Sequence, residues 1–254
     1  MKKQKDTISE WQLYSDYQWV WEMISNSDDY EPLSAYVVAK ISEHETHKTA
    51  TLLHLGCGSG NMDFHLKKHF EVTGVDLSPD MLASARKKNP ECRYFTGDMR
   101  TFSTNNRFDA VVIPDSINYL RSPEEMQQVF VNARKLLNPQ GLLLVIVPYD
   151  PEKFPQNRTT VDTVSDKGIE VTFVENNYAP GFEENTFEAT FVILIRDKQR
   201  QKTLIDIHTL GLFKKETWFK ELKKSGFEAL MYQDPQLEAT EQVGAFLLIG
   251  KNKK

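Results

Sequence analysis

A loop with glycine at three alternate positions follows an apolar run, Thr51–Leu55, that predicts a buried strand. The glycines are Gly56, Gly58 and Gly60, and a helical pattern begins directly after them. Glycine lets the chain turn sharply and lets a ligand approach the backbone without a Cβ in the way. The N–H groups at a helix start can bind a polar or anionic group. Asp76 closes the next predicted strand, and its carboxylate can accept hydrogen bonds from both hydroxyls of a ribose. The spacing therefore predicts a site for a ligand that contains a ribose.

The spacing of the glycine loop also separates two classes of ligand. The dinucleotide-binding fingerprint GxGxxG has Gly or Ala at its sixth position, where this sequence has Asn61. The tighter GxGxG pattern resembles the first motif of class I S-adenosylmethionine (SAM)-dependent methyltransferases more than the motif of NAD enzymes. The resemblance implies a Rossmann-like fold and SAM as the cofactor.

The resemblance to this family continues along the chain. Gly97–Met99, after the third predicted strand, is similar to the family's adenine-binding segment, in which an acidic side chain takes the adenine amino group. Phe108–Leu120 is similar to the fourth-strand motif, whose end faces the reacting methyl group. Asn138–Val147 resembles the segment that reaches the fifth strand.

The end of the chain carries a weaker likeness. His208–Leu230 resembles the C-terminal region of small-molecule methyltransferases, including sugar N-methyltransferases. The resemblance is strong over residues 50–148, and only fold-level analogy covers the region between. It implies transfer of the SAM methyl group to a small-molecule acceptor, with nitrogen or oxygen as the expected acceptor atom, by in-line displacement.

One position departs from the family pattern. The family usually has Asp or Glu two residues before the first glycine, where the acid helps to organise the methionine end of SAM. This sequence has His54 there. The glycine turn and Asp76 match the pattern, so the departure concerns only how the amino group of the cofactor is bound.

The residues expected at the cofactor come from the matched motifs and from an N-terminal aromatic segment. Relatives often fold such a segment over the cofactor as a lid, which is why Tyr14 is included. Cys57 is expected to fill space within the loop, because it has no partner cysteine and no context of a nucleophile. The full set is Tyr14, Leu55, Gly56, Cys57, Gly58, Asp76, Leu77, Met81, Gly97, Asp98, Met99 and Pro114.

Three residues are candidates for the chemistry of transfer. Asp115 and Tyr119 come just after the fourth predicted strand, and ligands of open α/β sheets bind beyond the carboxyl ends of the strands. His208 is a third candidate, as a general base or as a structural residue. A base is needed only when the acceptor is a hydroxyl or a protonated amine. No metal is expected, because the two cysteines, Cys57 and Cys92, lack metal-binding spacing.

The elements that must position these residues alternate between strand and helix. Predicted helices over 60–70, 78–87 and from Ser122 separate predicted strands at 51–55, 71–76, 92–95, 108–113 and 142–147. Ser78-Pro79 and Ser122-Pro123 supply N-caps and first-turn prolines, and Pro139 and Gly141 are expected to end the third helix. Nearly continuous apolar strands between amphipathic helices predict an α/β fold: a Rossmann-like, mostly parallel sheet with helices on both faces.

The two ends of the chain and a late segment extend this core. Residues 1–48 predict a helical lid with an aromatic face, formed by Trp11, Tyr14, Tyr17, Trp21 and Ile24. Alternating patterns at 169–175, 185–196 and 203–208 predict a small antiparallel β insert in the region 150–210. Because this insert is foreign to the cofactor fold, we expect it to be a substrate or oligomer region and hypothesise that it selects substrate. After a helix over 215–224, strands at 227–232 and 245–249 predict a C-terminal antiparallel hairpin. We interpret residues 1–254 as a single domain.

Composition limits the partners. The chain has 254 residues, 40% hydrophobic and 26% charged, with a net charge of −5. That balance predicts no nucleic-acid partner. No apolar run reaches the roughly 20 residues that cross a bilayer, and the N-terminus lacks the apolar core of a signal peptide. We expect a cytoplasmic protein, monomeric or homodimeric, with a small-molecule substrate and no membrane partner.

Three other functions stay open at this point. A non-catalytic SAM-binding regulatory module would bind the cofactor without transferring methyl groups. An NAD(P)-linked oxidoreductase is disfavoured by Asn61 and by the final strand hairpin. An RNA or DNA methyltransferase usually carries an NPPY-like motif near the fourth strand, where this chain has IPDS, Ile113–Ser116.

Overall fold

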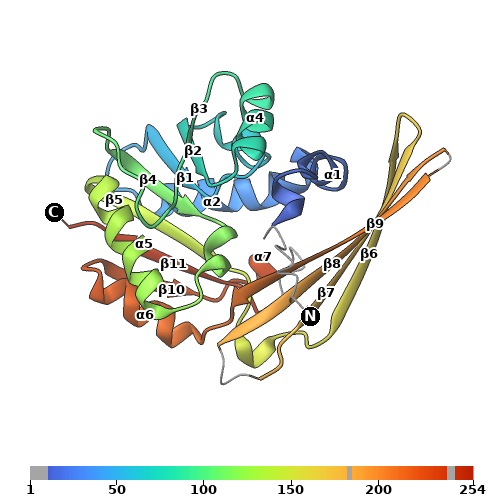
Figure 1. Ribbon diagram of the computed structural model, residues 1–254. Helices are drawn as coiled ribbons and strands as arrows, with labels where there is room; N and C mark the ends of the chain where they lie inside the picture. The colour runs from blue at the N-terminus through green and yellow to red at the C-terminus, as the bar shows by residue number, and fades with distance from the viewer. Residues whose placement is uncertain (1–10, 182–184, 199, 239–243, 254) are drawn as a thin grey trace, which may run out of the picture.

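A mostly parallel sheet forms the centre of the protein. The computed structural model describes residues 11–181, 185–198, 200–238 and 244–253. Within them, a seven-stranded sheet has the order β10-β11-β5-β4-β1-β2-β3, and only β11 runs against the others (Figure 1). Its strands are β1 (Thr51–Leu55), β2 (Glu71–Asp76), β3 (Arg93–Thr96), β4 (Phe108–Ile113), β5 (Leu137–Val147), β10 (Glu228–Tyr232) and β11 (Phe246–Lys251). The parallel core and the antiparallel C-terminal strand pair are both confirmed.

Helices cover both faces of this sheet. One apolar cluster joins the sheet to α5 and α6 through residues such as Phe130 and Trp218, and a second joins the other face to α2 through Ile41. Ser78 and Ser122 cap α4 and α5, each accepting a backbone N–H three residues on, at 3.1 and 3.3 Å. The helices are α2 (Glu31–His44), α3 (Asp63–Leu66), α4 (Pro79–Lys88), α5 (Pro123–Leu136), α6 (Lys215–Lys224) and α7 (Pro235–Glu238). None of the helices in the described ranges is long and apolar enough to cross a membrane.

A separate antiparallel sheet lies between β5 and α6 in the chain and extends away from the main sheet (Figure 1). After the short helix η4 (Pro151–Lys153), it contains β6 (Arg158–Asp166), β7 (Ile169–Tyr178), β8 (Thr186–Asp197) and β9 (Arg200–Gly211), paired in sequence order. The predicted insert is confirmed, with one strand more than expected. β6 was missed because most of its residues are exposed and its sequence, RTTVDTVSD, has no apolar alternation.

The N-terminal segment connects the two sheets. It consists of η1 (Gln12–Tyr14), α1 (Gln18–Ile24) and η2 (Ser27–Tyr30), so the predicted helix is interrupted. Four residues of the predicted aromatic face still pack against one apolar cluster: Tyr14, Tyr17, Trp21 and Ile24. Trp11 has a φ of 70°, and the chain turns again before η2, where Asn26 caps the new helix. Leu13 and Val20 are fully buried against the second sheet. The Leu13 N–H donates to Asp206 of β9 at 2.9 Å. On the other side, the Ser78 hydroxyl donates to the Tyr14 carbonyl. The predicted lid also includes residues 1–10, which lie outside the described residues.

Two predicted helix boundaries were wrong. The helix expected over 60–70 is α-helical only at Asp63–Leu66, because three-residue hydrogen bonds, such as His65 N–H to Met62 carbonyl, interrupt the four-residue pattern. Pro139 and Gly141 do not end α5, which stops at Leu136. They belong to the start of β5, where Asn252 donates to the Gly141 carbonyl at 3.0 Å.

Candidate cofactor and acceptor site

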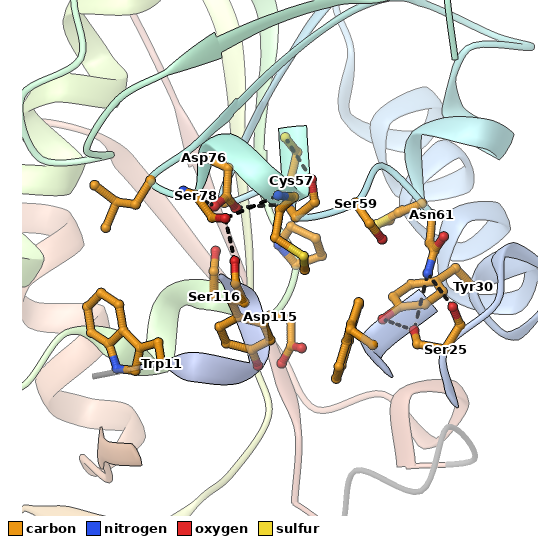
Figure 2. A pocket seen from close by; sticks show the side chains of 18 of the residues that line it. Trp11, Ser25, Tyr30, Cys57, Ser59, Asn61, Asp76, Ser78, Asp115 and Ser116 are labelled. Atoms are coloured by element: carbon orange, nitrogen blue, oxygen red, sulfur yellow. Dashed lines mark hydrogen bonds between the residues drawn. The ribbon is translucent and has the colours of Figure 1, made fainter. Parts of the chain in front are cut away.

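A cavity of about 710 Å³ lies between the main sheet, the N-terminal segment and the second sheet. The carboxyl ends of β1, β2 and β4 supply its floor, as expected for an open α/β sheet. Figure 2 shows residues from these parts of the chain converging on it, with Asp76 and Ser78 opposite Trp11 and Asp115 near the middle. Twelve of the predicted site residues line the cavity: Tyr14, Gly56, Cys57, Gly58, Asp76, Leu77, Met81, Gly97, Met99, Pro114, Asp115 and Tyr119. The structure does not bring Leu55, Asp98 and His208 to its wall.

The Asp76 carboxylate is fixed beside the glycine loop. One oxygen accepts the Gly58 N–H at 2.8 Å, and the other accepts the Ser78 N–H at 2.9 Å. Burial raises the pKa of Asp76, while these two backbone hydrogen bonds act against that rise. Each carboxylate oxygen keeps a further lone pair, and Asp76 lines the cavity. A Cβ on Gly58 would meet only the Met81 side chain, at 3.4 Å, so the loop leaves open space above its backbone. This arrangement fits a ribose.

An apolar part of the wall adjoins Asp76. Leu77, Met81 and Met99 contribute it, and Leu77 is 48% exposed although its side chain is large and apolar. These side chains and the backbone of Gly97 fit a flat, weakly polar ring such as adenine.

Asp98, predicted to bind the adenine amino group, is occupied by an ion pair. Arg100 contacts its carboxylate at 2.6 Å and contacts Glu125 at 2.6 Å. Burial favours the neutral acid, but the guanidinium and the Arg100 N–H outweigh burial and lower the pKa of Asp98. In this arrangement the Asp98 carboxylate points to Arg100, and its contact with adenine stays a prediction.

His54 lies in the cavity wall at the end of β1 and is 3% exposed. Its Nδ1 is 2.6 Å from an oxygen of Asp63, which is fully buried. The Tyr94 hydroxyl donates to the other Asp63 oxygen at 3.0 Å. The position that departs from the family pattern is therefore coupled to an acid from the next helix. Sequence reasoning missed Asp63, because nothing in the linear pattern placed it beside β1.

The acceptor-side candidates follow β4. Asp115 is exposed to the cavity yet lies deep in the protein. Burial raises its pKa to about 6, and the charge of Glu175 contributes to the rise. Tyr119, in η3 (Ser116–Tyr119), places its hydroxyl 2.8 Å from Nδ1 of His208. His208 is fully buried, with Nε2 at 3.1 Å from Asp206. Burial raises the pKa of Tyr119 well above the usual value, so its phenol stays protonated.

Several lining residues were not predicted as site residues. The second sheet contributes Asp162, Phe173 and Glu175, and the N-terminal segment contributes Trp11, Ser25, Tyr30 and Trp21. The sequence showed Trp11 and Trp21 as part of the aromatic face, but it did not show that they line a cavity. Glu175 lies on β7, and no local sequence pattern indicates that this strand reaches the cavity.

A family model described as a methyltransferase domain matches residues 52–141. A dTDP-3-amino-3,6-dideoxy-alpha-D-glucopyranose N,N-dimethyltransferase from Streptomyces fradiae is 31% identical over 200 residues, which are 78% of this chain and 77% of the relative. A dTDP-3-amino-3,4,6-trideoxy-alpha-D-glucopyranose N,N-dimethyltransferase from Streptomyces venezuelae is 30% identical over 178 residues, 69% of this chain and 74% of the relative.

Solved structures share the whole arrangement. SAM-bound CalS10, an amino pentose methyltransferase from Micromonospora echinaspora, is 25% identical with a TM-score of 0.77, covering 93% of this chain and 96% of its own. The sugar N-methyltransferase KedS8 from Streptoalloteichus has a TM-score of 0.81 at 23% identity, covering 94% and 92%. At that identity the second comparison shows the fold alone.

Proposed function

This chain belongs to the class I SAM-dependent methyltransferases, and we propose that the small molecule it methylates is an amine that binds between Asp115 and Glu175. The cofactor supplies a methyl group activated on a sulfonium. The protein must hold the two reactants in line and exclude water. We assign the cofactor end of the cavity to the ribose and adenine seats described above, and the space near Asp115 to the acceptor.

The observation that carries the proposal is the Asp115 carboxylate, open to the cavity at the end of β4. Glu175 of β7 also lines the cavity, and its charge acts on Asp115. Two carboxylates at one site favour a cation and disfavour an anionic acceptor group. An ammonium fits this site, and the two dimethyltransferases named above act on amino sugars.

Asp115 is also suited to take up a proton. An amine must lose its ammonium proton before its lone pair can attack a methyl group. With a pKa of about 6, Asp115 is mostly ionised at neutral pH and is a stronger base than an ordinary Asp. In the proposed step the ammonium N–H bond breaks, the proton goes to an Asp115 oxygen, and the freed electron pair stays on nitrogen for the attack.

Tyr119 and His208 are proposed to position the amine. His208 Nε2 lies 3.1 Å from the Asp206 carboxylate, which favours a hydrogen on Nε2, and in that tautomer the Nδ1 lone pair accepts the Tyr119 O–H. Tyr119 lines the cavity, and Tyr14 is a second hydrogen-bond partner of its phenol. In the proposed arrangement a remaining lone pair of the phenol oxygen accepts an amine N–H. Tyr14 and Trp11, whose rings lie 6.3 and 5.5 Å from the Tyr119 ring, contribute an aromatic wall that stabilises a cation.

The second sheet is proposed to select the acceptor. Glu175, Asp162 and Phe173 bring it to the cavity, in line with our interpretation of residues 150–210 as the substrate region of a single domain. Glu175→Gln should raise the KM for an amine acceptor while leaving the affinity for S-adenosylhomocysteine unchanged. A cytoplasmic location and a monomeric or homodimeric state stay predictions from the sequence.

A matched acceptor panel tests the proposal. Purified protein and isotope-labelled SAM are incubated with amino sugars and other small amines, and with analogues that carry a hydroxyl in place of each amine. Mass spectrometry of the products should show one or two added methyl groups on an amine and none on its hydroxyl analogue. Preferential methylation of hydroxyl analogues would contradict the amine assignment. Binding of S-adenosylhomocysteine without transfer to any acceptor would favour the regulatory-module alternative.

A further inference from the structure

His54 has a buried ring nitrogen without a hydrogen-bond partner among the described residues, and the residue lies in the cavity wall. The ring is 3% exposed and lines the cavity, and its Nε2 has no hydrogen-bond partner in the part of the chain that the structure describes. A buried polar atom without a partner is costly, and a bound ligand atom would remove that cost.

The rest of the ring is fixed. Nδ1 lies 2.6 Å from Asp63, and the Tyr94 hydroxyl holds the second Asp63 oxygen at 3.0 Å. The Asn89 amide in turn donates to Tyr94 at 3.0 Å and to the Gly60 carbonyl at 2.9 Å. This network joins the ring to the loop that carries Gly60, so His54 cannot turn to find another partner without breaking it.

The hydrogen bond to Asp63 determines what Nε2 can do. The Asp63 oxygen is an acceptor for an Nδ1 hydrogen, and in the tautomer with the hydrogen on Nδ1 the Nε2 atom keeps its lone pair. A carboxylate behind the ring makes that lone pair a better acceptor, as in the carboxylate–histidine pairs of metal sites. The best partner for such an atom is a cationic donor.

The cofactor has one such donor. The amino-acid end of SAM carries an ammonium, and His54 lies two residues before the glycine loop that borders the proposed ribose seat. We propose that His54 binds this ammonium through Nε2, with Asp63 supplying the negative charge from behind the ring. The pair then takes the place of the acid that this position usually holds in the family. The inference rests on SAM as the cofactor and is independent of the amine acceptor.

A pair of ligands and a pair of variants test this assignment. S-adenosylhomocysteine has the amino-acid end, whereas 5′-methylthioadenosine lacks it, and calorimetry gives the affinity of each. His54→Asn keeps a donor near the Nδ1 position for Asp63 and removes Nε2. We expect it to weaken S-adenosylhomocysteine binding about tenfold and to leave 5′-methylthioadenosine binding within about twofold.

Two controls define the comparison. His65→Asn changes another buried histidine, whose Nε2 is satisfied by the Ser27 carbonyl at 2.8 Å, and should leave both affinities unchanged. Asp76→Ala removes the ribose partner and should weaken both ligands. Equal weakening of both ligands by His54→Asn, or weakening of neither, would overturn the assignment.

A second measurement does not depend on a variant that folds. In the wild-type protein labelled with nitrogen-15 in histidine, S-adenosylhomocysteine should shift the Nε2 resonance of His54 and 5′-methylthioadenosine should not. Equal responses to the two ligands would again count against the proposal. Since neither measurement contains an acceptor, their outcome is separate from that of the acceptor panel.

Discussion

Replacing Gly56 by alanine tests how the glycine loop is positioned against η3. Gly56 has a φ of +74°, where an alanine costs about 1–2 kcal/mol. Its Cβ would lie 1.9 Å from the Ser116 hydroxyl oxygen and 2.4 Å from the Ser116 Cβ. Overpacking of this kind costs a further 1–3 kcal/mol, roughly. Together the backbone cost and the overpacking cost lower the free energy of unfolding by about 2–5 kcal/mol.

Gly168→Ala is the matched control. Gly168 also has a positive φ, +85°, but a Cβ there meets only the Lys198 side chain at 3.5 Å. It should therefore lose only the backbone contribution of about 1–2 kcal/mol. Urea denaturation measures both variants, and calorimetry with S-adenosylhomocysteine should show weakened binding for Gly56→Ala alone, because Gly56 lines the cavity.

A double variant separates the clash from the backbone cost. Ser116→Gly removes both atoms that Gly56→Ala would strike, although it also loses the hydrogen bond from Ser116 to the Leu55 carbonyl at 3.2 Å. The double variant should lose less free energy of unfolding than the two single variants lose together, by about 1–3 kcal/mol. Additive effects, together with equal losses at Gly56 and Gly168, would refute the steric reasoning.

Two further predictions concern pH and packing. Burial and Glu175 raise the pKa of Asp115 to about 6, so the active carboxylate is present above that pH and lost below it. The pH profile of kcat/KM should fall on the acid side near pH 6, and Asp115→Asn should abolish that limb. Because the folded pKa is above the ordinary value of 3.8, Asp115→Asn should also raise Tm above pH 6; an unchanged limb and Tm would contradict the assignment. Trp218 is fully buried, with ring centroids 6.4 and 5.9 Å from Phe130 and Phe213. Trp218→Ala should cost about 3–5 kcal/mol in urea denaturation, and Trp218→Phe much less; a loss below about 1 kcal/mol for Trp218→Ala would show that α6 packs differently.

The parallel core was predictable because its signals are local. A continuous apolar run such as Leu142–Val147 predicts a buried strand, and the Ser78 and Ser122 caps mark helix starts within a few residues. β6 was not predictable in this way, since hydrogen bonds to β7 stabilise it without an apolar face.

The residues of the candidate site likewise fall into those that local sequence patterns predict and those that they do not. Gly58 and Asp76 were predictable from the spacing of one loop and one strand end, and the structure joins them at 2.8 Å. Asp63, Glu175 and Asp206 were not, because their contacts depend on how separate elements pack: Asp63 of α3 contacts His54 of β1, the charge of Glu175 on β7 acts on Asp115 after β4, and Asp206 of β9 accepts the Leu13 N–H. The pattern placed His208 near the chemistry but could not show that Tyr119 stands between it and the cavity.

The hydrogen bonds of Leu13 and Tyr14 have a consequence for how ligands leave the cavity. The Leu13 N–H donates to Asp206 on the second sheet, and the carbonyl of the adjacent Tyr14 accepts from Ser78 at the cap of α4. Ser78 also donates its N–H to Asp76, the proposed ribose partner. A displacement of this short turn therefore breaks its contacts with the second sheet and with the cap of α4 together. We expect the spent cofactor and the methylated product to leave through one common opening event rather than through two independent ones.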